Sequence, residues 1–453
     1  MSKNFFNNNF VKIHFSGIGG ASMSALAKYL LLQGYTVSGS DIAENGNVAE
    51  LKKLGAKVYP KHTSNAVRGA DAMVYTSAIN FDNPELKYAT KKKIPLFKRS
   101  QLLGHIVEKY SQSIAVSGSH GKTTATAMIA NTLIKSQKDP TVFLGGESLE
   151  YGNLRLGKSE FCVLEACEYK KNFLDINAKI SLVLNIDKDH VDCYKDINEI
   201  KQAFKKFIDG KIAVLNADDV YCRQISHDTT VTFGIEKLAT YMAKSIKFNG
   251  KGYSFTAYAY GNPLGRINLS VIGKHNIYNA LATIAVCDLL KIPFSAVKSS
   301  LESFSSVKRR CEFIGNIGER ACFADYAHHP KEITAIVNAF KELGEEIAVV
   351  FQPHTYSRTK ALMNEFVKSL SNLQHLILYP TYPAREQFDG EGSAKTLFDN
   401  VNNKSCVPPI YAVSPIELKE AIANLSISCK KILFLGAGDI YQVATALVNN
   451  KNI

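Results

Sequence analysis

A glycine-rich segment in the first third of the chain combines residue types that hold phosphate groups. It follows an apolar run, Ile114–Ser117, and leads into a helical pattern. Such a loop wraps phosphates with backbone amides, adds the positive end of a helix and places a lysine on the terminal phosphates. A threonine hydroxyl after the lysine is a natural Mg²⁺ ligand. The segment predicts an ATP-type site formed by Gly118, Ser119, His120, Gly121, Lys122, Thr123 and Thr124.

The spacing of this loop differs from the common phosphate-binding pattern GxxxxGK[ST]. That pattern needs glycine at position 116, where this chain has Val116, and the spacing here is the shorter GxxGKT. Gly-Lys-Thr can also be an ordinary helix cap, but the strand before it and the helix after it favour a phosphate site. A lysine exposed in a loop contributes little to folding. We therefore expect Lys122→Ala to abolish activity and leave the fold intact.

Two later apolar runs end in residues suited to the same phosphates. Glu165 lies at the end of the run 161–166, and Asp187, Asp189 and His190 follow the run 180–186. In open parallel sheets, ligands bind beyond the carboxyl ends of the strands, so these ends can converge on one site. A glutamate and a histidine there could bind Mg²⁺ beside the phosphates. Taken alone, His190 could equally be a solvated loop residue.

A second glycine turn lies near the N-terminus. Gly17-Ile18-Gly19-Gly20 follows a strand-like run and precedes a helical pattern through 24–32, with Asp41 after the next expected strand. This arrangement is typical of dinucleotide sites, where an acidic residue binds a ribose. Ser22 stands where the strict GxGxxG pattern has its third glycine, so the turn is compatible with NAD or with any diphosphate. The separate ATP loop argues against a plain dehydrogenase.

These motifs need elements that position them, and the chain supplies an α/β pattern. Apolar runs bounded by glycine alternate with helical patterns, as in repeated strand–helix–strand units. We predict three domains, covering 1–110, 111–305 and 306–453, with antiparallel strands between 229 and 271 and a helix at 276–290. The other strands are expected at 11–16, 35–41, 72–78, 114–118, 161–166, 180–186, 211–217, 346–351, 375–380 and 431–436.

Composition excludes several classes of protein. The chain has 453 residues, 46% hydrophobic and 21% charged, which suffices for several cores, and no apolar run is long enough to cross a membrane. An N-terminal secretory signal is not apparent, and nine scattered cysteines without a CxxC pair predict neither disulfides nor zinc. We expect a cytoplasmic protein. The net charge of +13 suits nucleotide substrates, and without a nucleic-acid module we predict neither nucleic-acid nor membrane partners.

Read together, the motifs resemble those of the Mur ligase superfamily, in the expected order over nearly the whole chain. The pair DYAHHP and FQPHTYSRT is typical of the branch that adds the first amino acid. The matching segments are HFSGIGGASMSALA, YTSAINFDNPEL, GSHGKTT, EACEYKKNF, NIDKDHVDCY, GKHNIYNALA, RRCEF, DYAHHPKE, FQPHTYSRT and LGAGDI.

The resemblance implies a three-domain α/β fold. Its N-terminal domain is Rossmann-like and binds a UDP-sugar, its central ATPase domain is of the P-loop type with a mixed sheet, and its Rossmann-like C-terminal domain binds an amino acid. It also implies a reaction. The lactyl carboxylate of UDP-N-acetylmuramate takes the γ-phosphate of ATP, and L-alanine displaces phosphate from the acyl phosphate. This step belongs to peptidoglycan synthesis, and hence to cell-wall biogenesis, cell shape and cell division. We expect a monomer or weak homodimer.

The resemblance also implies roles for individual residues. Thr123 and Glu165 are expected to bind one Mg²⁺ and His190 a second, with Lys122, Glu165 and His190 forming the catalytic group. Asn276 is expected to contact adenine, although an asparagine there could simply cap its helix. The remaining expected contacts are Gly17, Gly19, Gly20, Asp41 and Ser77 for the UDP-sugar, Asn279, Arg310 and Asp325 for ATP, and Tyr326, His328 and Arg358 for alanine.

Three positions depart from many relatives: Ser22 replaces glycine, Cys167 replaces aspartate and Thr355 replaces arginine. The last change leaves Arg358 to carry the alanine carboxylate. Three alternatives stay open. A ligase that recycles a preformed peptide onto UDP-N-acetylmuramate would share the chemistry. A nicotinamide-dependent oxidoreductase would leave the GxxGKT loop and Glu165 without a role, and a non-catalytic nucleotide-binding regulator would not need Tyr326 and Arg358.

Overall fold

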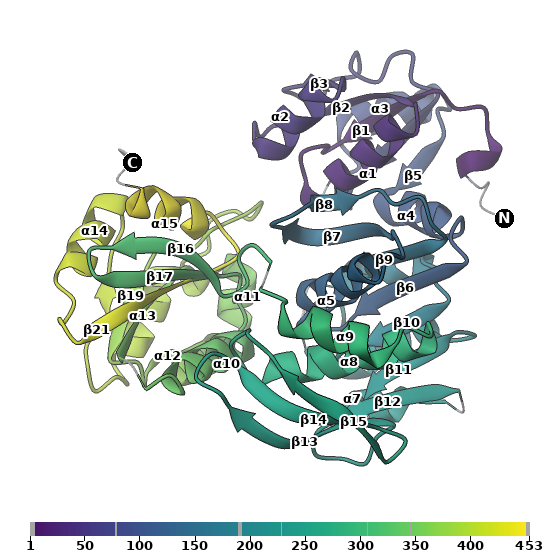
Figure 1. The fold of residues 1–453 in the computed structure, drawn as a ribbon. Helices are drawn as coiled ribbons and strands as arrows, with labels where there is room; N and C mark the ends of the chain where they lie inside the picture. Colours follow the sequence, from purple (N-terminus) through teal and green to yellow (C-terminus); the bar gives the residue numbers. More distant parts are fainter. Residues whose placement is uncertain are drawn as a thin grey trace. The chain divides into compact units, whose positions relative to one another are not determined.

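The computed structural model describes residues 5–77, 79–188, 193–227, 229–305, 307–344 and 346–449. The chain forms two compact units (Figure 1). Unit 1 comprises Met1–Lys244, Thr256–Gly265 and Tyr278–Glu302, and unit 2 comprises Ser245–Phe255, Arg266–Ile277 and Ser303–Ile453. Strands of the described residues assemble into three sheets, with 5, 10 and 6 strands. The domain boundaries at 110 and 305 stay predictions.

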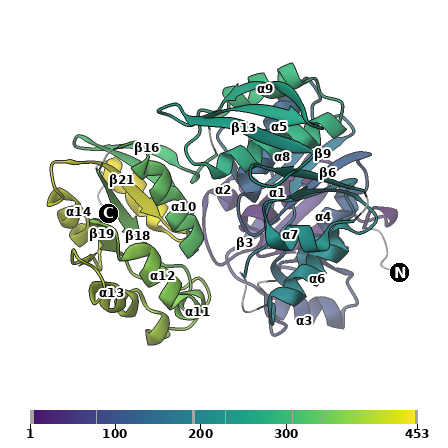
Figure 2. The ribbon, with the colours of Figure 1, turned by 90° about the horizontal axis from the view of Figure 1, so that it is seen from below.

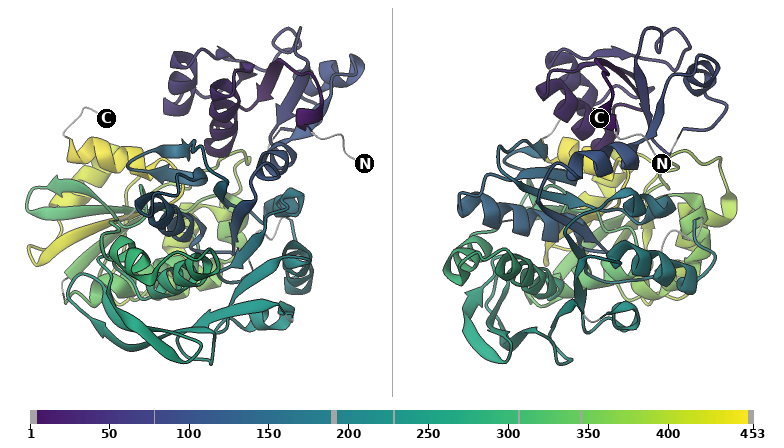
Figure 3. Two further views of the ribbon diagram at one scale, coloured as in Figure 1. Left: turned by 45° about the vertical axis from the view of Figure 1, so that its right-hand side comes forward. Right: turned by 90° about the vertical axis from the view of Figure 1, so that its right-hand side faces the viewer.

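The first sheet is parallel throughout and has the order β3-β2-β1-β4-β5. Its strands are β1 (Lys12–Ser16), β2 (Thr36–Ser40), β3 (Lys57–Tyr59), β4 (Ala72–Tyr75) and β5 (Leu96–Lys98), and its helices are α1 (Ala21–Leu32), α2 (Gly46–Lys53), α3 (Pro84–Lys91) and α4 (Arg99–Val107). Figure 3 gives two further views of these elements, coloured purple to blue. The chain order reverses at β1, so the crevice beyond its carboxyl end is where this topology binds ligands.

The second sheet is mixed, with the order β15-β14-β13-β12-β11-β10-β6-β9-β7-β8. Parallel strands β6, β9, β10 and β11 form its centre, and β7 and β8 make an antiparallel hairpin at one edge. The strands are β6 (Gln112–Ser117), β7 (Thr141–Ser148), β8 (Gly152–Arg155), β9 (Phe161–Glu165), β10 (Ile180–Val183), β11 (Ile212–Asn216), β12 (Thr230–Gly234), β13 (Tyr241–Phe248), β14 (Tyr253–Ala259) and β15 (Asn262–Asn268). The helices are α5 (Lys122–Lys135), α6 (Ile197–Ile208), α7 (Val220–Ile225), α8 (His275–Leu289) and α9 (Phe294–Glu302).

The prediction of antiparallel strands from 229 is wrong for β12. This strand pairs in parallel with β11 and with β13. The reason is α7, a short helix between β11 and β12 that the sequence did not reveal, because it lets the chain cross over and run in the same direction again.

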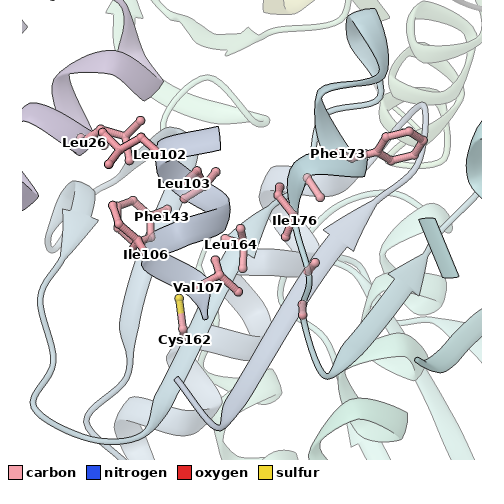
Figure 4. Close-up of a cluster of buried hydrophobic side chains, with 14 of the residues drawn as sticks. Leu26, Leu102, Leu103, Ile106, Val107, Phe143, Cys162, Leu164, Phe173 and Ile176 are labelled. Atoms are coloured by element: carbon pink, nitrogen blue, oxygen red, sulfur yellow. The ribbon is translucent and has the colours of Figure 1, made fainter. Parts of the chain in front are cut away.

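The first two sheets of unit 1 share one hydrophobic core. Leu26 of α1, Leu102 of α4, Phe143 of β7 and Leu164 of β9 all belong to it and are buried (Figure 4). Burial of each such side chain stabilises the fold by roughly 1.5–3 kcal/mol. Helix α1 is therefore packed firmly against the hairpin of the second sheet.

The third sheet has the order β16-β17-β21-β18-β19-β20, antiparallel only between β16 and β17. Apolar clusters lie on both of its faces, and Figure 2 shows its strands between α14 and α10. The strands are β16 (Glu312–Ile317), β17 (Arg320–Asp325), β18 (Glu346–Phe351), β19 (His375–Leu378), β20 (Ile410–Tyr411) and β21 (Cys429–Leu435). The helices are α10 (Pro330–Lys341), α11 (Tyr356–Ala361), α12 (Met363–Leu370), α13 (Ala394–Asn402), α14 (Pro415–Ala423) and α15 (Ile440–Val448).

Two expectations drawn from composition can be compared with this fold. All nine cysteines are free, as their scattered positions predicted. Among the described residues, no helix is both long enough and apolar enough to span a bilayer.

Candidate active site

The phosphate loop connects β6 to α5, as the sequence predicts. Gly118 and Gly121 have φ of +135° and +85°, a region in which a side chain is strained. Gly121 is also the N-cap of α5 and provides no side-chain cap. The first amides of α5 are therefore not capped by that residue, and with the positive helix end they suit an anionic phosphate.

Asn185, which lies just after β10, holds the loop in shape. Its Oδ1 accepts a hydrogen bond from the His120 amide at 2.8 Å, and its Nδ2 donates to the His120 carbonyl at 3.0 Å. The Ser119 amide donates to the Asn185 carbonyl at 3.1 Å, and the Asp187 amide donates to Ser119 Oγ at 2.8 Å. Sequence analysis missed Asn185, although its place at a strand end beside Asp187 was a usable signal.

Lys122 forms an ion pair with Glu168, another residue that the sequence analysis missed. Its Nζ lies 3.1 Å from Glu168 Oε2 and also donates to the carbonyls of Gly118 and Ser119 at 2.5 and 3.2 Å. Burial lowers the pKa of this lysine, but the charge and hydrogen bond of Glu168, together with the nearby groups Cys167 and Glu165, outweigh burial and raise that pKa above its ordinary value. Lys122 is therefore a cation held inside the loop.

The expectation that Lys122 is exposed is wrong. Its side chain is 16% exposed and that of Glu168 is 3% exposed. Removing the lysine leaves a buried carboxylate without its counter-ion, and that change is costly. The substitution Lys122→Ala therefore lowers stability, contrary to the expectation drawn from the sequence.

The expected metal ligands Thr123 and Glu165 lie together. Thr123 Oγ1 donates to Glu165 Oε2 at 3.1 Å, and the Gly145 amide of β7 donates to Glu165 Oε1 at 2.7 Å. A Cβ on Gly145 would lie 2.8 Å from Glu165 Oε2, so the strand approaches the carboxylate closely. A hydroxyl and a carboxylate are hard oxygen donors, which fit Mg²⁺. His190 and Asp189 lie outside the described residues, so the second metal ligand stays a prediction.

Asn279 of α8 also reaches the loop. A Cβ on Gly121 would lie 3.1 Å from Asn279 Oδ1. Asn276 is the second residue of α8, one position inside the helix, and its buried side chain donates to the Ile272 carbonyl at 2.7 Å. The structure brings Asn279 to the phosphate loop, and a contact between Asn276 and adenine stays a prediction.

The N-terminal glycine turn follows β1, beyond the carboxyl end of that strand. Gly17 has φ of +80°, its amide donates to the Ser40 carbonyl at 2.8 Å, and a Cβ there would lie 2.9 Å from a methyl group of Thr76. The Gly19 amide donates to Asp41 Oδ2 at 2.8 Å. Asp41 therefore shapes the turn, which is a role besides the expected sugar contact. Ser77 lies on the loop after β4, where its carbonyl accepts from Lys170 Nζ at 2.8 Å.

A buried carboxylate lies beneath this turn. Glu85 is fully buried and accepts hydrogen bonds from Ser16 Oγ at 2.6 Å and Ser40 Oγ at 2.8 Å. His62 Nδ1 lies 3.1 Å from it, and His14 Nε2 lies 3.4 Å from it. Burial opposes ionisation of Glu85, but the hydrogen bonds from these neighbours outweigh it and hold its pKa well below the ordinary value. The hydrogen bond to Glu85 raises the pKa of His62.

In unit 2, the predicted ATP residues Arg310 and Asp325 lie around Tyr326. The Asp325 carboxylate accepts hydrogen bonds from the backbone amides of Cys311 at 2.7 Å and Ala327 at 2.8 Å. Burial raises the pKa of Asp325. The guanidinium of Arg310 lies 5.2 Å from the centre of the Tyr326 ring. The structure thus brings together two of the expected ATP contacts with one of the expected alanine contacts.

The expected alanine residues His328 and Arg358 both adjoin His354, which the sequence analysis did not single out. Arg358 Nη1 lies 3.2 Å from His354 Nδ1, and the rings of His328 and His354 are 5.9 Å apart. Burial, with the nearby side chains of His328 and Arg358, lowers the pKa of His354 to about 3. A neutral His354 can accept a hydrogen bond from Arg358. The usable signal was its place in the same short segment, HTYSRT, just before the helix that carries Arg358.

Comparisons with known proteins identify the family of this chain. Three family models match successive parts of the chain: "Mur ligase family, catalytic domain" at 12–111, "Mur ligase middle domain" at 116–287 and "Mur ligase, glutamate ligase domain" at 309–438. The UDP-N-acetylmuramate–L-alanine ligase of Acetivibrio thermocellus is 40% identical, with 98% of this chain and 97% of that protein covered. The chain belongs to the Mur ligase family.

Other members of the family match over equally long spans. The UDP-N-acetylmuramate–L-alanine ligase of Aquifex aeolicus is 39% identical, covering 98% of each chain. The crystal structure of UDP-N-acetylmuramate-alanine ligase from Thermotoga maritima has a TM-score of 0.83 at 30% identity, covering 97% of this chain and 98% of that one. A murein peptide ligase of Psychrobacter arcticus has a TM-score of 0.74 at 22% identity, covering 98% and 100%, and shows the common fold alone. The predicted three-domain Mur ligase fold is confirmed.

Proposed function

We propose that this protein joins L-alanine to the lactyl carboxylate of UDP-N-acetylmuramate, with ATP converted to ADP and phosphate. The observation that carries the proposal is its 40% identity, over 98% of the chain, to a UDP-N-acetylmuramate–L-alanine ligase. The reaction places the protein in peptidoglycan synthesis, and thereby in cell-wall biogenesis, cell shape and cell division. A cytoplasmic location and a monomer or weak homodimer complete the proposal.

The first chemical step takes place at the phosphate loop. A lactyl carboxylate oxygen attacks the γ-phosphorus, the bond to the bridging oxygen breaks, and ADP leaves. The Gly118–Thr124 amides and Lys122 stabilise the charge that spreads over the transferred phosphoryl group. In the described state Lys122 is bound to Glu168 and to loop carbonyls, so Glu168 keeps the cation beside the site of transfer. Thr123 and Glu165 would hold Mg²⁺, which would add positive charge beside the ATP phosphates.

The second step forms the amide. The alanine amine attacks the acyl carbon, the tetrahedral intermediate collapses, and the carbon–oxygen bond to phosphate breaks. A guanidinium can bind a carboxylate with two parallel hydrogen bonds, which suits Arg358 to orient alanine. Tyr326 and His328 are the other proposed contacts. Gly17, Gly19, Gly20, Asp41 and Ser77 are proposed to hold the UDP-sugar, and Asn276, Asn279, Arg310 and Asp325 to hold ATP.

A phosphate-release assay with UDP-N-acetylmuramate, ATP and a panel of acceptors tests the proposal. We expect release to depend on L-alanine, with the UDP-N-acetylmuramoyl-L-alanine product identified by mass. Release with a preformed tripeptide but without alanine would instead establish the peptide-recycling ligase. Release of phosphate with neither acceptor, or no dependence on the UDP-sugar, would contradict both.

A further inference from the structure

Asn153 of β8 joins the hairpin of the second sheet to the first turn of α1, and nothing above gives it a role. Its side chain is 2% exposed. Nδ2 donates to the Ala21 carbonyl at 2.7 Å and to Ser24 Oγ at 2.9 Å, while Oδ1 accepts from Lys28 Nζ at 3.0 Å. A buried amide satisfied on both its atoms fixes the groups that it contacts.

The residues that Asn153 contacts follow the N-terminal glycine turn directly. Gly20 is the N-cap of α1 and has no side-chain cap, so the direction of the first helical amides depends on the turn that Asn153 holds. Arg99 supports the same turn from another side, because its Nη1 donates to Ser22 Oγ at 2.8 Å. These amides are the groups that would face the diphosphate of a UDP-sugar.

The other strand of the hairpin reaches the candidate metal site. The Gly145 amide of β7 donates to Glu165, and a Cβ on Gly146 would lie 2.9 Å from a methyl group of Thr123. Strands β7 and β8 pair at Phe143 with Leu154 and at Ser148 with Gly152, on either side of Asn153. The hairpin therefore touches the Thr123–Glu165 pair with one strand and α1 with the other.

The junction is packed as well as hydrogen-bonded. Leu26 of α1 and Phe143 of β7 share the core shown in Figure 4. Lys28 is buried apart from its end, which pairs with Glu50 at 2.5 Å. Closely packed interiors transmit small displacements rather than absorbing them. The hairpin that lines the ATP site therefore fixes the position of the first turn of α1.

We propose that Asn153 is a positioning residue for the UDP-sugar site: its amide fixes the first turn of α1, so that the turn at Gly17–Gly20 has the right geometry for the diphosphate. The inference rests on the proposed function, because it assumes that the UDP-sugar binds at that turn. The two polar atoms of the Asn153 side chain, here called its Nδ2 arm and its Oδ1 arm, have different roles. The Nδ2 arm serves the ligand through Ala21 and Ser24, and the Oδ1 arm to Lys28 serves the packing.

Calorimetric titrations of each variant with UDP-N-acetylmuramate and, separately, with the magnesium complex of a non-hydrolysable ATP analogue test the proposal. Asn153→Leu removes both arms at similar size, and Asn153→Asp removes the donor while keeping an acceptor for Lys28. We expect both to raise the Kd for the UDP-sugar about tenfold, because hydrogen bonds to buried groups are lost. The Kd for the ATP analogue stays within about twofold of the wild-type value.

Two further variants separate positioning from a loss of stability. Lys28→Met removes the Oδ1 arm together with the ion pair to Glu50 and leaves the Nδ2 arm in place. Thr132→Val removes a buried hydroxyl that donates to the Met128 carbonyl within α5. Both are expected to keep the wild-type Kd for the UDP-sugar. Asn153→Asp is the milder change, and it carries the test if Asn153→Leu does not fold.

The outcomes are distinct. An unchanged Kd for the UDP-sugar in folded Asn153→Asp would overturn the inference. Equal losses for both ligands would overturn it too, because they would mark a general loss of structure. Failure of the wild-type protein to bind UDP-N-acetylmuramate would instead contradict the proposed function.

Discussion

Two glycine turns in unit 1 have the same local design but differ in where their positive charge comes from. Each follows a parallel strand, contains a glycine with positive φ and opens a helix whose N-cap has no side chain. The loop before α5 places a lysine cation at the start of its helix and a threonine beside a carboxylate. The turn before α1 has Ala21 and Ser22 at the corresponding position, and the cation beside it, Arg99, comes from α4 and donates to Ser22 Oγ.

The difference fits the two proposed roles, a diphosphate site at the first turn and phosphoryl transfer at the second. Holding a diphosphate needs amides in a fixed direction, whereas transferring a phosphoryl group also needs preorganised positive charge at the reacting atoms. The buried groups fit this division. Glu85 beneath the first turn is surrounded by hydroxyls and imidazoles that keep it in place, while Glu168 beside the second pairs with the lysine itself.

The largest expected effect comes from replacing Lys122, the cation of the second turn. Lys122→Met should reduce ligation by on the order of 10²–10³ or more, because a charge that acts on the transferred phosphoryl group is lost. It should also destabilise the protein by about 3 kcal/mol, because Glu168 is left buried without its counter-ion. Turnover assays and urea unfolding measure the two effects.

The double variant Lys122→Met with Glu168→Gln separates activity from stability. It removes the buried charge as well, so we expect stability to recover while activity stays low. Recovery of activity in the double variant would show that the lysine is structural and not catalytic.

Matched substitutions of one positive-φ glycine in each turn test whether each turn serves its own substrate. Gly17→Ala places a Cβ at positive φ and 2.9 Å from Thr76, and Gly121→Ala places one at positive φ and 3.1 Å from Asn279. Each should cost about 1–2 kcal/mol of local strain. We expect Gly17→Ala to raise the KM for the UDP-sugar roughly tenfold and to spare ATP. Gly121→Ala should raise the KM for ATP and spare the UDP-sugar. Steady-state kinetics with one substrate varied at a time measures both KM values, and a variant that raises the KM for the other substrate would contradict this expectation.

The smallest expected effect is a pH dependence at the first turn. The folded pKa of His62 is raised by Glu85, so its contribution to stability is complete below the unfolded pKa of about 6.5. That contribution is lost as the pH rises through the folded pKa. Thermal unfolding of wild-type protein and His62→Gln should therefore differ more at pH 5.5 than at pH 8.5. A difference that grows towards pH 8.5 would be the wrong sign and would reject the His62–Glu85 pair.

Sequence reasoning reached the parts of both sites that local pattern determines. A strand, a glycine turn and a helix start are contiguous in the chain, so Gly17, Gly121 and Lys122 could be located from spacing alone. The carboxyl end of a parallel strand gave Glu165, which the structure places beside Thr123.

Partners from distant segments could not be read in the same way. Glu168 and Asn185 meet the phosphate loop only because β9 and β10 flank β6, and Asn153 meets α1 only through the hairpin edge. Because Glu168 was not recognised as the partner of Lys122, the sequence analysis wrongly expected the lysine to be exposed. The predicted direction of β12 was wrong for a similar reason, because a polar, alternating strand pattern does not reveal whether a short helix precedes the strand.

In the proposed reaction, ATP phosphorylates the lactyl carboxylate before alanine attacks. The most direct measurement uses UDP-N-acetylmuramate with both carboxylate oxygens replaced by ¹⁸O, together with ATP and L-alanine, and follows the label by mass spectrometry. We expect one ¹⁸O in the inorganic phosphate and one in the amide carbonyl of the product. Label in AMP, or phosphate released without ¹⁸O while the amide forms, would contradict it.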